Sequence, residues 1–532
     1  MNLVNNNSFD IIVIGGGATG AGIALDASSR GLSVLLLEQN DFASGTSSKS
    51  SKLIHGGVRY LEKAIKQLDK EQFNLVKEGL YERALFIKNA PHLAKKLKLD
   101  TPIYNNFEII YVYIGLLLYK LISGKKSIGS NTFINKTLLS LLQPSIKKKD
   151  LVGAVSFFDG RFIDSRMVIA LLQSAQNYGT VVRNYSEVKE FIYDSEHKIK
   201  SLKYTNKITD EEFSVDASYI INATGANVDN IRLLDDEKVE EILSLSSGIH
   251  LILDKKFLPS DEGILIPQTS DGRVIFILPY LGKCLIGTSD EKTVYTKEPK
   301  ASNEEIEYLL KHINEYFDIK ICKDDILSVW SGIRPLVKPL SNGHTEEIVR
   351  EHKILSSDSG LISIAGGKWT TYRKMAEELV DYVCEKGINK KVKKSKTKHL
   401  KVHGSRKNLK KIKKELEIHD KLSKQTKQSL LNLYGSEALG ILSIAYVYNA
   451  FELIHKDLPF IKAEIIYCIK HEFAKKPIDF LARRISLCFI DKKKSLECLL
   501  MVCQTFKVQL LWSNDKFQNE LNESKKLIEE LF

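Results

Sequence analysis

In the first forty residues, apolar runs alternate with stretches of small residues. Residues 11–14 form a continuous apolar run, which is typical of a parallel strand that is buried on both faces. A helix is expected from about residue 18 to residue 29, because Gly31 ends it and a second apolar run follows at residues 33–37. The pattern therefore predicts a strand–helix–strand unit near the start of the chain.

The turn between the first strand and the helix carries glycines at the spacing G-x-G-x-x-G. Gly15 permits the tight turn, Gly17 lets the backbone approach a diphosphate, and Gly20 lets the helix pack against the strand. The start of the helix then presents free N–H groups and the positive end of its dipole to phosphate. Glu38 follows the second strand and is placed to accept hydrogen bonds from a ribose. Together these residues predict a dinucleotide site.

Three other segments are rich in small and hydroxyl-bearing residues. Residues 44–60 form a long loop where a nicotinamide-binding fold would continue with another strand and helix, and residues 220–226 and 361–373 each join an apolar strand to a small-residue turn. A helix that starts at the last turn can stabilise negative charge on a reduced flavin. These segments predict FAD, bound in an extended form. The residues expected to face it are Gly15, Gly17, Gly20, Glu38, Thr46, Ser47, Ser48, Ser51, Gly225, Gly367, Lys368 and Thr370.

Several of these stretches resemble one family, the FAD-dependent glycerol-3-phosphate dehydrogenases in their bacterial, aerobic form. Residues 46–60 look like the first signature of that family, and residues 366–373 look like its second. Tyr280 and Trp369 depart from the usual residues, but neither change removes a charged or hydroxyl group. Further matches, in the expected order, are residues 247–250, 286–290, 331–336 and 464–484.

The resemblance implies an α/β fold with a Rossmann-like FAD-binding domain, an α+β substrate (cap) domain and an all-α C-terminal domain. We expect a discontinuous oxidoreductase region at residues 1–388, a lysine-rich linker at 389–423 and a helical domain at 424–532. Alternating apolar positions in the cap indicate an antiparallel sheet. The predicted FAD-binding parts are residues 1–90, 150–245 and 335–388, and the predicted cap parts are residues 91–149 and 246–334.

The substrate that the resemblance implies, sn-glycerol 3-phosphate, has a dianionic phosphate and a secondary alcohol. Arginine suits the phosphate, because its planar guanidinium can donate two hydrogen bonds and stays charged. Arg59 and Arg334 are the predicted clamp, since both lie beside glycines in signature loops. Further substrate contacts are expected from Tyr60, Thr371, Lys368 and, less strongly, Arg350.

Oxidation of the alcohol also needs a base, and histidine suits this role because its ordinary pKa lies close to the working pH. His250 is ranked first, because the cap should face the alcohol from across the flavin ring, and His55 in the first flavin loop is second. Lys368 with a lowered pKa is the remaining option. The predicted catalytic set is therefore His250, His55, Lys368 and Arg334, and no metal ligands are expected.

The reduced flavin must pass its electrons on, and the sequence contains no second redox motif. The acceptor is therefore expected to be diffusible, and the resemblance implies a membrane quinone. A glycerol-3-phosphate oxidase that uses O2 and produces H2O2 shares the signatures and stays open as the alternative. A non-catalytic flavoprotein that docks on membranes or nucleic acid is disfavoured, because a scaffold needs none of His250, Arg334 and Lys368.

Composition narrows the compartment and the partners. The seven cysteines lack C-x-x-C spacing, which favours a reducing cytoplasm over disulfides or zinc. The net charge of +12 is densest at residues 390–414, a run that suits either a solvated linker or an anionic surface. Aromatic residues do not interleave this run, so a nucleic-acid partner is not expected.

Residues 107–123 form the one strongly apolar stretch that invites assignment as a membrane span. The stretch is shorter than the roughly 20 residues that a span needs, so a buried or interfacial helix is expected. The cofactor motif begins at residue 10, which predicts no cleavable presequence. The expected location is the cytoplasm, in association with the inner face of the cell membrane. A homodimer is left open.

Overall fold

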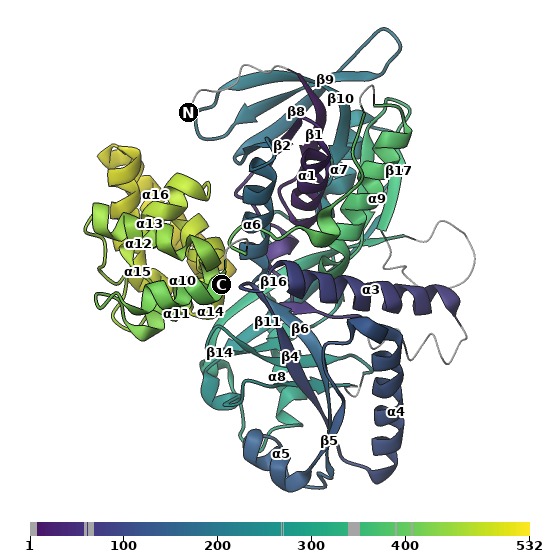
Figure 1. The fold of residues 1–532 in the computed structure, drawn as a ribbon, viewed down its shortest axis with the longest axis vertical. Coiled ribbons are helices and arrows are strands. Elements are labelled where there is room, and N and C mark those ends of the chain that lie inside the picture. The colour runs from purple at the N-terminus through teal and green to yellow at the C-terminus, as the bar shows by residue number, and fades with distance from the viewer. Residues whose placement is uncertain are drawn as a thin grey trace.

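The computed structural model describes residues 8–57, 61, 69–267, 269, 271–338, 352–388, 391–405 and 408–532. These residues form three parts, of which two are built around a β-sheet and the third is helical (Figure 1). The helical part lies beside both sheet-containing parts (Figure 1).

The first sheet domain begins with the predicted strand–helix–strand unit. Its strands, in sheet order, are β17 (His352–Ser356), β18 (Ile362–Gly366), β10 (Glu212–Asn222), β1 (Ser8–Ile14), β2 (Val34–Leu37) and β7 (Val181–Arg183), and β8 (Ser186–Tyr193) and β9 (Ile199–Asn206) extend it beside β10. The helices that pack on this sheet or lead from it are α1 (Ala18–Arg30), α3 (Lys70–Asn89), α6 (Asp164–Gln176), α7 (Val228–Asp235) and α9 (Tyr372–Glu385).

The β1–α1 turn has the close packing that its glycines allow. β1 pairs in parallel with β10 and β2 and is buried from its second residue onward. Gly15 has φ +111°, in the left-handed region. A Cβ atom on Gly20 would stand 1.9 Å from the Gly15 carbonyl oxygen, so any larger residue would push α1 away from the strand. The N-terminus of α1 is therefore held at the carboxyl ends of the central strands.

The second sheet domain is a mixed, mainly antiparallel sheet. Its strands, in sheet order, are β15 (Glu291–Lys292), β11 (Leu243–Leu253), β14 (Lys283–Gly287), β13 (Ile275–Tyr280), β12 (Gly263–Ile266), β4 (Ala94–Ile103), β6 (Gly153–Phe162) and β3 (Leu53–Ile54), with β16 (Ile326–Val337) on β11 and β5 (Thr132–Asn135) on β6. Its helices are α4 (Asn106–Ser123), α5 (Lys136–Leu142) and α8 (Asn303–Asn314). The sequence pattern assigns β3 and β6 to the first domain, whereas β6 pairs with β4 along ten residues of the second sheet.

The helical domain shares one apolar core with the second sheet domain. Its helices are α10 (Leu409–Glu417), α11 (Lys424–Tyr434), α12 (Ala438–Val447), α13 (Lys462–His471), α14 (Leu487–Ile490), α15 (Lys492–Leu510) and α16 (Asn514–Leu531), with one π-helical turn at Asp479–Arg484. α10 lies within the lysine-rich segment that is expected as a linker. It buries Ile412 and Leu416 in the same core, so part of that segment belongs to the helical domain.

Buried ion pairs attach the helical domain to the first sheet domain. Asp41, in the loop after β2, accepts hydrogen bonds from Arg483 at 2.5 Å and from both terminal nitrogens of Arg484 at 2.7 and 2.9 Å. Arg166 on α6 pairs in the same bidentate way with Glu472. Burial alone would raise the pKa of Asp41, but the charges of Arg484 and Arg483 outweigh it and hold the pKa below its ordinary value. These charges are therefore compensated only while the two domains stay together.

Replacing Asp41 with Asn should destabilise the protein at pH 7 by about 3–5 kcal/mol, because the change leaves buried guanidinium groups without a counter-charge. The free energy of unfolding from urea denaturation measures the effect. Glu190→Gln is the matched control, since Glu190 makes an exposed ion pair with Lys203 and its loss should leave the unfolding midpoint unchanged. Equal midpoints for Asp41→Asn and the wild type would refute the role assigned to this interface.

Candidate functional site

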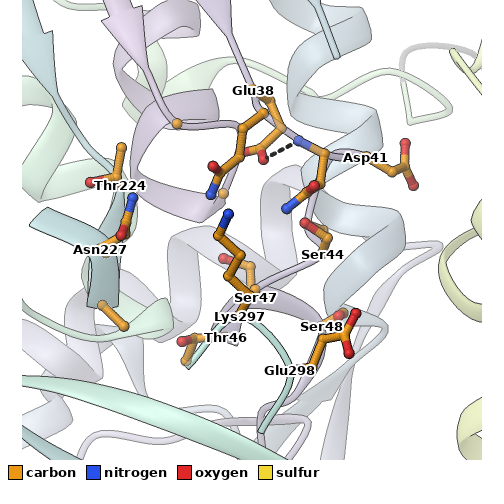
Figure 2. A pocket seen from close by; sticks show the side chains of 18 of the residues that line it. Glu38, Asp41, Ser44, Thr46, Ser47, Ser48, Thr224, Asn227, Lys297 and Glu298 are labelled. Atoms are coloured by element: carbon orange, nitrogen blue, oxygen red, sulfur yellow. Dashed lines mark hydrogen bonds between the residues drawn. The ribbon is translucent and has the colours of Figure 1, made fainter. Parts of the chain in front are cut away.

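A cavity of about 730 Å³ runs along the carboxyl ends of β1 and β2. Its walls come from the β1–α1 turn, the loop after β2, the turn after β10, a loop of the second sheet domain and residues of the helical domain (Figure 2). Gly15, Gly17, Glu38, Thr46, Ser47, Ser48 and Gly225 all line it. Seven of the residues predicted to face a cofactor are thus brought to one cavity.

Glu38 braces the glycine turn. One carboxylate oxygen accepts a hydrogen bond from the Gly16 N–H at 2.7 Å, and the other accepts one from the Asn40 N–H at 2.9 Å. Burial raises the pKa of Glu38, and these two N–H groups oppose that rise. Each carboxylate oxygen has more than one lone pair, so the predicted contact with a ribose stays a prediction that this geometry permits.

The hydroxyl groups of the loop after β2 are engaged in different ways. The Ser47 hydroxyl accepts a hydrogen bond from the Ala18 N–H at the start of α1 at 2.9 Å, and the Thr46 hydroxyl donates to the Ile333 carbonyl at 2.5 Å. Ser48 has a buried side chain. A Cβ atom on Gly17 would lie 2.9 Å from the Ser47 oxygen, so the turn, the helix start and the loop form one tight cradle. A cradle of N–H groups, hydroxyls and bare backbone suits a diphosphate.

A buried ion pair under the loop was not predicted from the sequence. The Lys52 ammonium lies 2.7 Å from one Asp164 oxygen and 2.9 Å from the other, and it also donates to the Ser48 carbonyl at 2.5 Å. Asp164 in turn accepts from the Ser50 hydroxyl at 2.7 Å. Burial lowers the pKa of Lys52, and Asp164 opposes that effect. The pair fixes the curvature of the loop that carries Ser47 and Ser51.

The third predicted segment closes against the same loop. The Trp369 indole N–H donates to the Ser47 carbonyl at 3.0 Å, and the Thr370 hydroxyl donates to the His55 carbonyl at 3.2 Å. The Thr371 hydroxyl turns back to the Lys368 carbonyl at 3.2 Å. Trp369, which departs from the family pattern, therefore joins the two signature segments through its ring nitrogen. Gly367, which has φ +79°, precedes this helix start.

His250 reaches the loop from the other domain. It lies on β11, its Nε2 is 2.8 Å from the Ser51 hydroxyl, and its ring stacks on Trp330 with centroids 5.3 Å apart. Its Nδ1 has no hydrogen-bond partner in the described part of the chain. Burial, and then the charges of Arg334 and Lys52, hold the pKa of His250 well below its ordinary value. The imidazole is therefore neutral at pH 7.

Arg334 lies on the neighbouring strand β16, where it is opposite Ser246, four residues along β11 from His250. Its guanidinium donates to the hydroxyl groups of Ser246 and Thr288, and it forms an ion pair with Asp290 at 3.0 Å. A Cβ atom on Gly248 would stand 2.2 Å from an Arg334 terminal nitrogen, so only glycine leaves room for the side chain. The guanidinium is thus oriented by the cap sheet, and its side chain stays 26% exposed.

Three of the other predicted site residues, Arg59, Tyr60 and Arg350, lie outside the described residues. His55 is half-buried at the end of the first loop. In the parts of the chain that are described, no three histidine, cysteine, aspartate or glutamate residues gather as a metal site.

Several cations that line the cavity were not predicted from the sequence, among them Lys49 and Arg483. Burial lowers the pKa of Lys49 to about 8, and the neighbouring charge of Arg483 adds to this shift. Lys49 stands inside the first signature, so its position in that loop was an available signal. Arg483 comes from the helical domain, and no local pattern places it near residue 49.

Comparisons with known proteins agree with this geometry. Residues 10–373 match the family model "FAD dependent oxidoreductase", and residues 395–517 match "C-terminal domain of alpha-glycerophosphate oxidase". A mitochondrial glycerol-3-phosphate dehydrogenase of Arabidopsis thaliana is 37% identical over 98% of this chain and 86% of its own length. The mitochondrial glycerol-3-phosphate dehydrogenase of Bos taurus is 38% identical over 99% of this chain and 74% of its own length.

The solved structures include a close match to the whole fold. The glycerol-3-phosphate dehydrogenase of Bacillus halodurans, crystallised with FAD, is 30% identical, has a TM-score of 0.78 and covers 99% of this chain and 96% of its own. The predicted fold class and the predicted cofactor, FAD, are therefore confirmed. The chain is an FAD-dependent oxidoreductase that belongs to the family of glycerol-3-phosphate dehydrogenases.

Proposed function

We propose that this enzyme oxidises sn-glycerol 3-phosphate to dihydroxyacetone phosphate and passes the electrons to a membrane quinone. The observation that carries the proposal is the contact between His250 of the cap and Ser51 of the FAD loop, with Arg334 close by. A neutral base that contacts the cofactor loop and a fixed cation thus lie on the same sheet. FAD, when bound, supplies the acceptor for the hydride from C2 of the substrate.

The residues around the cavity fit FAD. The cradle formed by Gly17, Ala18 and Ser47 offers backbone and hydroxyl groups to the diphosphate, and Glu38 stands where a ribose would follow. Thr46, Ser48, Gly225, Gly367 and Thr370 belong to the segments that converge there. These roles rest on position and chemistry together.

His250 acts as the base in this proposal. A neutral imidazole can take the proton of the C2 hydroxyl, and the Nε2 atom already faces the loop that holds FAD. The Ser51 hydroxyl orients the ring, and Trp330 supports its face. His55 and Lys368 remain the alternative groups for this proton.

Arg334 binds the phosphate, together with Arg59, Tyr60, Lys368, Thr371 and, less strongly, Arg350. Its ion pair with Asp290 and its bonds to the cap hold the guanidinium in place before substrate arrives, which lowers the entropy cost of binding. A dianionic phosphate is a stronger partner than a single carboxylate. We therefore expect the substrate to share or replace the contact with Asp290.

The membrane part of the proposal rests on α4. In the described residues, two helical stretches are long and apolar enough to cross a membrane, Asn106–Lys126 and Lys424–Val447, and the first is only 17% buried. Phe107 is 86% exposed, and Ile110 and Ile114 are also exposed on α4. The helix runs along the edge of the second sheet domain, away from the helical domain (Figure 1).

The two faces of α4 differ in a way that suits an interfacial helix. Its inner face is anchored by the Tyr119 hydroxyl, which accepts from the Gly56 N–H at 2.7 Å and donates to Asp159 at 3.0 Å. Its outer face is apolar, and lysines follow at its C-terminal end. Such a helix lies in the headgroup region of an anionic bilayer. This would place the enzyme at the inner face of the cell membrane, near its quinone.

His250→Gln should lower the rate constant for anaerobic flavin reduction by glycerol 3-phosphate by about 10²–10⁴-fold, the usual range for loss of a general base. Stopped-flow absorbance of the flavin measures it. Ser51→Ala should cost much less, because it removes only the group that orients the ring. Since the pKa of His250 is held well below 6.5, the wild-type rate should stay constant between pH 8 and pH 7. A normal rate for His250→Gln would transfer the role to His55 or Lys368.

Arg334→Ala should reduce kcat/KM for glycerol 3-phosphate by about 10²-fold, as expected for the loss of a charge-assisted contact. Glycerol, which has the same alcohol and no phosphate, serves as the matched probe. The slow rate of flavin reduction by glycerol should be the same in the wild type and the variant. A parallel loss with both substrates would show that Arg334 supports the cap rather than the phosphate.

The double substitution Ile110→Glu and Ile114→Glu should abolish cosedimentation with vesicles of anionic phospholipid at low salt. It should leave the reduction of a water-soluble dye unchanged, because the cavity is not touched. Leu500→Glu with Val508→Glu, two exposed apolar residues on α15, is the control and should still bind. If α4 instead mediates a homodimer, light scattering would show a monomer for the variant and unchanged vesicle binding.

The acceptor is tested on the same vesicles. Flavin reoxidation should be faster with a quinone analogue than with air. Stoichiometric H2O2 in air, with no acceleration by quinone, would identify the oxidase instead.

A further inference from the structure

A loop of the cap domain forms one wall of the FAD cavity. Residues 295–299, which follow β15, line the cavity together with the loop after β2. Figure 2 shows Lys297 and Glu298 from this loop beside Ser47 and Ser48. The loop belongs to neither of the signatures that mark the cofactor site, and the sequence predicts it only as part of the cap.

Both ends of the loop are anchored. The Thr293 N–H donates to the Leu245 carbonyl at 3.0 Å on the side of the cap sheet. On the other side, Pro299 is buried and Lys300 forms an ion pair with Glu530 of α16 at 2.8 Å. Tyr295 is half-buried and close to Gln39 and Glu38, and burial raises its pKa above the ordinary value. The loop is therefore held over the cavity by contacts with all three domains.

Lys297 extends its ammonium group from this loop into the cavity (Figure 2). In the described part of the chain, no ion pair within 4 Å joins Lys297 to a carboxylate, although its charge acts on Glu187. Its nearest charged neighbours include Glu187 and Lys207. Glu187 is already paired with Lys189 at 2.5 Å, and Lys207 is a like charge. The cavity thus contains a cation whose charge is not balanced by a carboxylate of its own.

The surrounding charges favour an anion near Lys297. The start of α1 presents its N–H groups to the cavity. Lys49 and Lys207 also line it, and Glu298, the acid next to Lys297, acts on Lys49 and raises its pKa against the effect of burial. Glu38 is engaged by two N–H groups. The diphosphate of FAD carries two negative charges and suits this arrangement.

We propose that residues 293–299 form a clamp over the diphosphate of FAD, in which Lys297 supplies a positive charge from the cap domain. The helix start and the Ser47 loop bind the diphosphate from below, and the clamp binds it from the side of the cap. FAD is then held by the cap as well as by the Rossmann-like domain. The exposed ion pair of Lys300 with Glu530 also joins the loop to α16.

The test uses the full-length protein with its FAD removed, titrated with FAD and followed by flavin fluorescence. Lys297→Met should raise the Kd for FAD by about fivefold to tenfold, because the Lys297 side chain is exposed and a solvated charge contributes less than a buried one. Lys297→Arg should restore most of the affinity. Lys292→Met, the removal of an exposed cation from β15 outside the cavity, is the matched control and should leave the Kd unchanged.

Two smaller probes distinguish a diphosphate contact from general support of the cavity. ADP should bind Lys297→Met more weakly than the wild type by the same factor, whereas adenosine should bind both equally. The rate at which diluted holoenzyme releases FAD gives a second measure that does not need the apoprotein, and it should rise in Lys297→Met. An equal loss for adenosine and ADP, or an unchanged Kd and release rate for FAD, would overturn the proposal.

Discussion

The buried ion pair between Lys52 and Asp164 is the interaction on which the site depends. It joins the start of α6 to the loop after β2 and fixes the carbonyl of Ser48 and the hydroxyl of Ser50. Ser47 and Ser51 stand on either side of these anchors, and they contact the N-terminus of α1 and His250. A buried pair of this kind is costly to break, because one partner alone would leave an uncompensated charge. The loop therefore keeps one shape, and the cofactor cradle and the proposed base keep their spacing.

The proposed active site is composite, and each domain supplies a different property. The first sheet domain contributes a helix start, bare backbone and hydroxyls, which suit phosphate and ribose. The cap contributes His250 and Arg334 from adjacent strands, where the pairing of β11 with β16 sets their separation. The helical domain contributes Arg483, which is held by Asp41. Because the domains are joined by buried charges, the proposed chemistry and the stability of the fold are coupled.

The cap loop and α4 lie on different parts of the cap domain, and we propose a binding function for each. Lys297 faces the cavity from a loop with no signature, and α4 exposes apolar residues while its Tyr119 contacts the backbone of Gly56. In our proposals, the cap loop binds the cofactor and α4 binds the membrane surface. α4 contacts the loop between β2 and α3 through Tyr119, and the cap loop lines the cavity with the same loop, so retention of FAD and access to quinone would be tied to one segment.

The N-terminal unit was determined by sequence, since strand, glycines, helix and Glu38 are consecutive and each has a local steric reason. The small and hydroxyl-bearing residues of segments 44–57 and 366–371 predict that both segments face the cofactor. In the structure, Trp369 and Thr370 of the second segment donate hydrogen bonds to the first. Only the tertiary structure decided that Asp164, Arg483 and Lys297 join this site. Their positions result from the pairing of distant strands and the packing of a separate domain. Local periodicity does not indicate which charged residues, far apart in the sequence, come into contact.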